Sequence, residues 1–197
     1  MTEFTLEDAI SKRRSHRAFD DRPLPLPIVH KLLWSAQGIT GQSGERTVPS
    51  AHALHPLHLI VSAGLVTNLS VGAYCVSNDT LKLIPHLDHD LRPGLALVAL
   101  DDQPWISSAP AILTICADMV SVSQAFVEQP PFGVRGRRYA YIEAGAAAQN
   151  IQLQACAEGL ACVLIAGFRD EATADVLNLQ EPYEPIAHLC IGWPAVD

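Results

Sequence analysis

Charged residues are scarce in this 197-residue sequence, and long hydrophobic runs are absent. Only 17% of the residues are charged whereas 49% are hydrophobic, a balance more apolar than a solitary solvated domain usually needs. No apolar run reaches the roughly 20 residues that span a bilayer. The net charge of −8 argues against a general attraction to nucleic acid or to an anionic membrane. We therefore expect a protein that binds neither, and that buries its excess apolar surface against a second copy.

The sequence also lacks the cysteine pairs and glycine motifs of several protein classes. Its five cysteines are odd in number and form no Cys-x-x-Cys pair, which argues against a disulfide framework and a zinc site. Residues 1–4 carry neither a basic leader nor an apolar signal core. There is no P-loop, no Gly-x-Ser-x-Gly motif and no dinucleotide-binding glycine fingerprint. These absences favour a cytoplasmic protein in a reducing compartment.

Histidines at 52, 55 and 58, with further possible ligands at 86–89, raise the alternative of a metal site. Pro56 disfavours a helix in the first group. In an extended segment the side chain of His55 would point away from those of His52 and His58. We therefore expect no bound metal.

Apolar periodicity and turn residues predict an α+β fold, in one domain over residues 1–197. A capping signal at Thr5 and Asp8 starts a helix expected to reach Ser15, and an apolar stripe predicts a second helix that stops at Gly38. Asp170 is expected to cap a short late helix. Residues 91–100 are expected to be helical, and the expected strands occupy residues 57–61, 71–77, 81–83, 111–117, 162–165 and 186–191. The strand at 111–117 is apolar throughout, as in a strand covered on both faces.

The longest predicted helix covers residues 139–159 and contains a run of alanine and glycine at 144–148. Such small side chains let another backbone approach closely. We expect this helix to lie at the centre of the fold or at a contact between subunits.

Four of the thirteen lysines and arginines fall within residues 12–17, Lys-Arg-Arg-Ser-His-Arg. In an acidic protein this cluster indicates one focused anion site, because guanidinium groups and a hydroxyl suit the oxygens of a phosphate. The alternative is a solvated helix end whose cations complement the helix dipole.

Four segments, in order along the chain, match the motifs of one known family. They are residues 13–20 (Arg-Arg-Ser-His-Arg-Ala-Phe-Asp), 49–56 (Pro-Ser-Ala-His-Ala-Leu-His-Pro), 132–150 (Phe-Gly-Val-Arg through Ile-Glu-Ala-Gly to Ala-Gln-Asn) and 165–168 (Ile-Ala-Gly-Phe). Together they resemble the FMN-dependent nitroreductase family. The similarity is to the branch that contains the thiazoline and oxazoline dehydrogenases of peptide modification, along with many stand-alone proteins.

The resemblance implies a nitroreductase-like fold, with a mostly antiparallel central sheet surrounded by helices, and a homodimer with FMN at its interface. The N-terminal motif would hold the flavin phosphate and the polar ring edge, and the second motif would reach the flavin across the interface. The fourth would lie along the ring, with a backbone N–H directed at N5. The implied cofactor-binding residues are Arg13, Arg14, Ser15, Arg17, Pro49, Ser50, Ala51, His52, Leu164, Ile165, Ala166 and Gly167.

The resemblance also implies an oxidoreductase with NADH or NADPH as co-substrate. Hydride would pass through N5 of the flavin to a nitroaromatic, a quinone or a similar planar small molecule, so no side chain needs to be catalytic. Two alternatives stay open. One is a flavin dehydrogenase acting on a specific small molecule or modified peptide, and the other is a flavin-binding or redox-sensing protein without turnover.

The sequence departs from the family's patterns in three places. His52 stands where the branch often has glycine. Pro131 and Phe132 replace the Lys-Tyr pair of the azoline dehydrogenases, and we expect Phe132 to offer an aromatic wall to the substrate. Residues 193–197, after the last expected strand, supply no basic residue, so the phosphate charge could come from the arginines at 135–138. Those arginines could instead cap the following helix, pair with Glu143 or be solvated.

Overall fold

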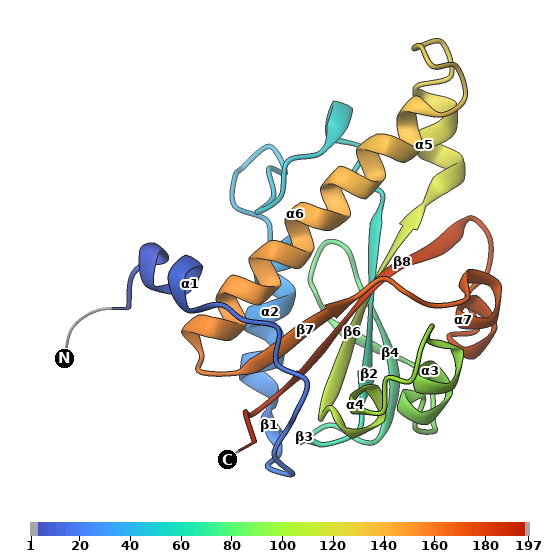
Figure 1. Cartoon of the computed structure of the whole chain (residues 1–197). Helices are drawn as coiled ribbons and strands as arrows, with labels where there is room; N and C mark the ends of the chain where they lie inside the picture. The colour runs from blue at the N-terminus through green and yellow to red at the C-terminus, as the bar shows by residue number, and fades with distance from the viewer. Residues whose placement is uncertain (1–3, 196–197) are drawn as a thin grey trace.

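A six-stranded sheet forms the centre of the computed structural model, which describes residues 4–195 (Figure 1). Every neighbouring pair of strands is antiparallel, which confirms the expected α+β class. Two predictions, for residues 1–4 and for residues 193–197, therefore lie partly outside the described residues. In sheet order, the strands are β5 (Leu83–Leu87), β4 (Gly72–Val76), β2 (Leu57–Ala63), β6 (Ala111–Asp118), β8 (Tyr183–Gly192) and β7 (Ala161–Ile165).

Strand β6 is buried from Ala111 to Ala117, as its continuous apolar sequence predicts. Its side chains alternate between two cores. Leu113 and Ile115 belong to one apolar cluster, and Ile112 and Cys116 belong to the other. The sheet is therefore the middle layer of three.

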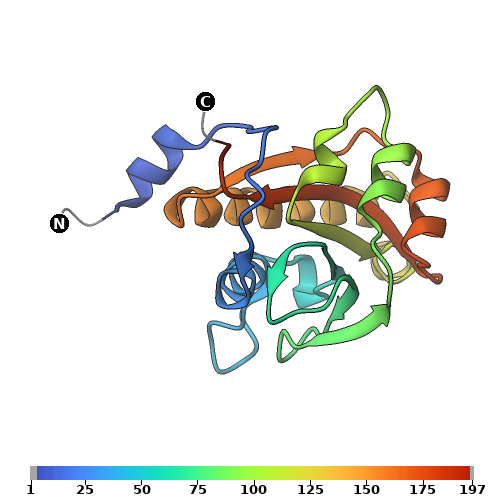
Figure 2. The same cartoon turned by 90° about the horizontal axis from the view of Figure 1, so that it is seen from below.

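Helices cover both faces of the sheet (Figure 2). On one face, α2 (Leu26–Gln37) and α6 (Arg135–Ala157) contribute Leu33, Ala144 and Ile151 to the first cluster. On the other face, Leu95 and Ile106 pack from α3 (Arg92–Val98) and α4 (Trp105–Ser108). Val176 packs there from α7 (Asp170–Val176). A two-stranded parallel ribbon, β1 (Leu24–Pro25) with β3 (Val66–Thr67), lies beside this body.

Helix α6 lies close against the sheet because its inward face is made of small residues. Ala140, Ala144, Ala147 and Ala148 are buried, and the helix spans 23 residues. This confirms its expected central place. The helix begins at Arg135, four residues before the prediction, so the arginines at 135–138 form its first turn.

Helix α1 (Leu6–Lys12) has the predicted capping box, because the Thr5 side chain accepts from the Asp8 N–H and Asp8 accepts from the Thr5 N–H. The prediction that the helix reaches Ser15 is wrong. Arg13 has an extended backbone, and the His16 N–H donates to the Cys162 carbonyl at 3.0 Å. This contact with β7 draws residues 13–17 out of the helix and along the sheet.

At three further places the structure differs from the sequence-based expectation. Asp170 is not the cap of α7 but its first residue, since the N-cap is Arg169 without a side-chain hydrogen bond. Strand β5 starts at Leu83 because Leu81 has a positive φ of 53°. Helix α5 (Met119–Ala125) had not been expected, and Asp118 caps it by accepting from the Ser121 N–H. No helix within residues 4–195 has the length and apolarity to cross a membrane.

Candidate functional site

The N-terminal basic residues form a strap along β7, defined here as residues 13–17. Arg13 donates to the Gln152 side chain of α6 at 3.4 Å, and the Arg17 guanidinium lies 5.6 Å from the centre of the Trp105 ring. Arg14 turns back onto the carbonyls of Ser11 and Arg13 instead. No carboxylate within residues 4–195 forms an ion pair with these three arginines. Their positive charge is therefore available to an anion.

Strand β7, which the strap contacts at Cys162, is the edge strand of the sheet and is open on one side. Leu164 is 37% exposed, whereas Val163 and Ile165 point to the opposite face of β7 and are buried. Ala166 is exposed, and the Gly167 carbonyl accepts from the Leu100 N–H at 2.8 Å. A Cβ at Gly167 would meet only Leu100, at 3.8 Å. A planar group can therefore approach the backbone here, and Ile165 would contribute to it through its backbone alone.

The second predicted loop, residues 49–52, leads into η1 (Ala51–Ala53), a single turn of 3-10 helix. The Ala51 N–H donates to Glu143 Oε1 on α6 at 2.8 Å, and Ser50 Oγ accepts from the His55 N–H at 2.8 Å. The His52 ring packs against the Phe126 ring with centres 4.8 Å apart and planes tilted by 48°. Pro49 and His52 remain exposed.

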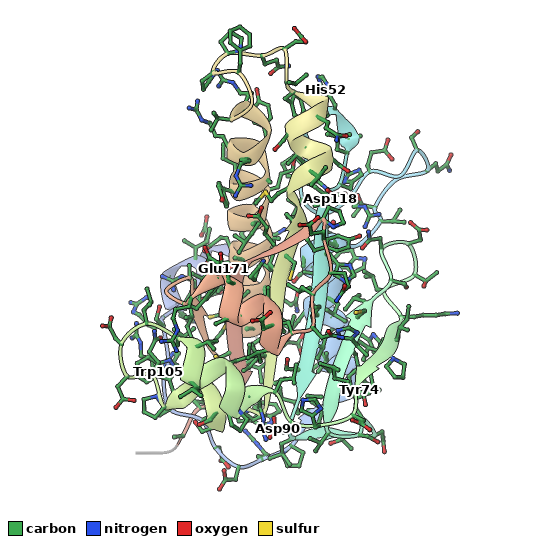
Figure 3. The ribbon with its side chains drawn as sticks, turned by 90° about the vertical axis from the view of Figure 1, so that its right-hand side faces the viewer. His52, Tyr74, Asp90, Trp105, Asp118 and Glu171 are labelled. Carbon is green, nitrogen blue, oxygen red and sulfur yellow. The ribbon has the colours of Figure 1, made fainter. Side chains whose placement is uncertain are left out.

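These two groups of residues lie apart within one chain. Arg13 contacts α6 at Gln152, whereas Ala51 contacts it at Glu143; nine residues of helix separate those points, or about 14 Å. Figure 3 shows His52 and Trp105, the neighbour of Arg17, at opposite ends of the molecule. The structure thus places the first motif along β7, whose far end leads into the fourth motif, and leaves the second motif apart.

Phe132 lies in the loop between α5 and α6 and is 69% exposed, so its ring is free to contact another molecule. Arg135 donates to the Pro130 carbonyl in the same loop. Arg137 forms an ion pair with Glu184, at 2.7 Å, which lowers the pKa of that carboxyl. The alternative in which these arginines pair with Glu143 is wrong, because Glu143 faces the other way and binds the 49–52 loop.

Glu143 is the site residue that sequence reasoning missed. The residue is only 6% exposed. Burial raises the pKa of Glu143, while hydrogen bonds from the Ala51 N–H and the Ser50 hydroxyl oppose that rise. The available signal was an acidic residue within the small, inward-facing stripe of the longest helix, where an unpaired carboxylate would be costly.

The histidines considered as metal ligands have other contacts. His58 stacks on Tyr183 with ring centres 4.8 Å apart, and His86 Nε2 lies 2.9 Å from the Leu177 carbonyl. Within residues 4–195, no three His, Cys, Asp or Glu side chains are grouped so that they could hold a metal ion.

Comparison with known proteins agrees with this geometry. The model of the Nitroreductase family matches residues 10–193. A protein of Methanocaldococcus jannaschii named "Putative nitroreductase MJ1384" is 35% identical over 179 residues, which cover 91% of this chain and 87% of that protein.

Solved structures give the same result. A crystal structure named as a "putative nitroreductase" of Ralstonia eutropha has a TM-score of 0.81 and 27% identity, over 100% of this chain and 86% of that one. A chain of the microcin synthetase McbBCD complex of E. coli shares the fold, with a TM-score of 0.73 and 21% identity over 100% of this chain and 74% of its own. This chain belongs to the nitroreductase family.

Proposed function

We propose that this protein is an FMN-dependent oxidoreductase that passes hydride from NADH or NADPH to a nitroaromatic, a quinone or a similar planar acceptor. Family membership supports the general oxidoreductase activity. One observation supports the finer assignment: cations without a carboxylate partner within residues 4–195 lie along the edge strand β7, beside Cys162.

The residues of the strap and of β7 fit FMN. Arg13 and Arg17 would hold the phosphate and the polar ring edge by charge-assisted hydrogen bonds, and the exposed Ser15 would add a hydroxyl donor. Leu164 offers an apolar surface to the ring, and the open backbone at Gly167 allows close approach.

FMN, when bound, supplies the hydride chemistry. The chain's own part is to hold the cofactor, to keep one ring face accessible and to place positive charge near the ring edge. A cation there stabilises the reduced form, and Arg17 is our candidate. A planar acceptor would find an apolar partner in Phe132.

We propose further that residues 1–197 are one FMN-binding domain of a cytoplasmic homodimer. Phe4, Leu6 and Ile10 of the N-terminal segment are exposed, and α1 extends away from the body in Figure 1. On α6, Tyr141 and Ile142 are also exposed. A second copy would cover both surfaces, and its 49–52 loop would complete the site that one chain leaves divided. All five cysteines are free thiols, which supports a reducing compartment.

The test is the absorbance spectrum of the purified protein, with the released cofactor identified by mass, followed by NADH and NADPH oxidation with quinone and nitroaromatic acceptors. We expect a yellow protein that releases FMN and turns over with both acceptor classes. Bound FMN without any turnover would favour the redox-sensing alternative. A protein that binds no flavin, even when FMN is added, would refute the proposal.

A further inference from the structure

A buried carboxylate joins the 49–52 loop to the long helix. Glu143 projects from α6 and is 6% exposed, yet the group that donates to its carboxylate, the Ala51 N–H at 2.8 Å, comes from a distant part of the chain. A buried carboxylate is costly unless its oxygens are paired. This hydrogen bond therefore fixes the 49–52 loop to α6.

The loop needs such a support because its backbone is strained. His52, Ala53 and His55 have positive φ angles of 52°, 52° and 48°. Residues with a Cβ rarely adopt this region, and they stay in it only when the surrounding structure holds them there. Two further contacts hold the loop, namely the Ser50–His55 hydrogen bond and the packing of the His52 ring against Phe126.

The held loop presents its outer surface to solvent. Pro49, His52 and Ala53 are exposed, while the anchoring groups face α6. Strained backbone that is fixed from behind and exposed in front is typical of ligand-binding segments, because a loop ordered in advance loses less entropy when it binds.

We propose that Glu143 is a positioning residue, which holds the 49–52 loop in the left-handed conformation that contacts the flavin ring. This inference rests on the proposed function, since the ligand is the FMN of that site. Glu143 itself lies behind the loop and acts through Ser50 and Ala51. Glu143 should therefore govern binding of the flavin ring, whereas Arg13 should govern binding of the phosphate.

The experiment compares Glu143→Ala and Glu143→Gln with the wild type. The matched control is Glu184→Gln, which removes a carboxylate that also pairs with α6, through Arg137, but does not touch the loop. Two quantities are measured: amide hydrogen exchange at Ala51 and His55 in flavin-free protein, and the dissociation constants for FMN and riboflavin by fluorescence titration.

In Glu143→Ala we expect fast exchange at both amides. FMN and riboflavin should both weaken by the same factor of about 10 to 100, the size expected when a buried hydrogen-bond partner is lost. Glu143→Gln keeps an acceptor for the Ala51 N–H. It should therefore restore most of the amide protection and most of the affinity for both flavins. Glu184→Gln should leave the amide exchange and the flavin dissociation constants unchanged. If Glu143→Ala does not fold, Glu143→Leu fills the buried space without an acceptor for the Ala51 N–H and should give the same pattern.

The contrary results are distinct. Unchanged exchange at Ala51 and His55 would show that Glu143 does not hold the loop, whatever the flavin does. Fast exchange with unchanged flavin affinity, or a loss confined to FMN, would show that the loop is held for another purpose, and either overturns the proposal. Wild-type protein that binds neither flavin would refute the proposed function itself, and the flavin part of this inference with it.

Discussion

At the scale of single residues, the arginines of the strap have different surroundings. Arg13 reaches α6 and Arg17 lies over Trp105, whereas Arg14 bonds to nearby carbonyls of its own segment. Arg13 and Arg17 are therefore the better phosphate ligands, and Arg14 contributes mainly through its charge.

Replacing Arg13 by alanine should weaken FMN and leave riboflavin nearly unaffected. A charge-assisted hydrogen bond to phosphate contributes about 1.5–3 kcal/mol, so the expected loss for FMN is roughly 10- to 150-fold. Arg14→Ala is the matched control and should have a smaller effect. Equal losses of both ligands in Arg13→Ala would move the phosphate site elsewhere.

Phe132 and Pro131 predict that the protein does not oxidise azoline peptides. A well-placed base contributes about 100- to 10,000-fold to proton abstraction, and neither side chain can act as one. The protein should reduce quinones or nitroaromatics and fail to oxidise thiazoline or oxazoline peptides.

This is measured by mass spectrometry of an azoline peptide incubated with flavin-loaded protein and oxygen. A loss of two mass units at a rate comparable to quinone reduction would mean that another residue serves as the base. His52 would then be the first to replace.

His188 should make the stability depend on pH. It is buried on β8, with Nδ1 2.8 Å from the Thr114 hydroxyl, and burial lowers its pKa to about 4. In the unfolded chain the pKa is about 6.5, so the unfolded state binds the proton first as the pH falls. The stability from neutral His188 is complete above pH 6.5 and is lost towards pH 4, by roughly 3 kcal/mol.

Urea unfolding of the wild type and of His188→Gln between pH 7 and pH 4.5 measures this contribution. The difference in unfolding free energy between the two proteins should shrink as the pH falls. A difference that stays constant would show that His188 does not titrate on unfolding.

At the scale of the elements, α5 and α6 pack through a glycine. A Cβ at Gly136 would lie 1.9 Å from the Val122 carbonyl oxygen, whereas nothing lies within 4 Å of a Cβ at Gly145. Figure 1 shows this pair extending beyond the end of the sheet, so its geometry sets where the Phe132 loop lies.

Gly136→Ala should therefore force the two helices apart and destabilise the protein by about 1–3 kcal/mol. Gly145→Ala should change the stability by less than about 1 kcal/mol. Denaturant midpoints of the two variants give the comparison. Similar midpoints would mean that the contact between α5 and α6 can relax.

The sequence predicts most elements because apolar periodicity determines which face is buried. β6 and α2 match their patterns, and Gly38 ends α2 as expected. The errors arise where a tertiary contact or a local turn outweighs the apolar pattern. The strap leaves α1 early for a hydrogen bond with Cys162, and β5 starts late because of the turn at Leu81.

The candidate site was predictable only in part. Arg13, Arg17 and Gly167 were selected by motif. The strap lies against β7 at Cys162, and Gly167 follows the opposite end of that strand. The role of Glu143 was not predictable, since it depends on two segments that are far apart in the sequence. Ile165 was assigned to the site by its motif, but the alternation of β7 turns its side chain into the core.

At the scale of the whole molecule, exposed apolar surface and a divided site both point to a second copy. Light scattering at dilute, near-physiological conditions should report a dimer. Dilution should release flavin together with subunit dissociation, because each site would need two chains. A folded monomer that retains FMN would refute both the dimer and the role of the 49–52 loop.

The strap has another consequence, for the solubility of the protein. The end strands of an open sheet carry unpaired backbone groups that attract strands of other molecules. Here β5 carries Pro85, and β7 has the arginine-rich strap bonded to its Cys162 carbonyl. A chain shortened past Arg17 would lose this cover as well as its phosphate ligands. It should therefore aggregate through β7, and added FMN should not prevent it.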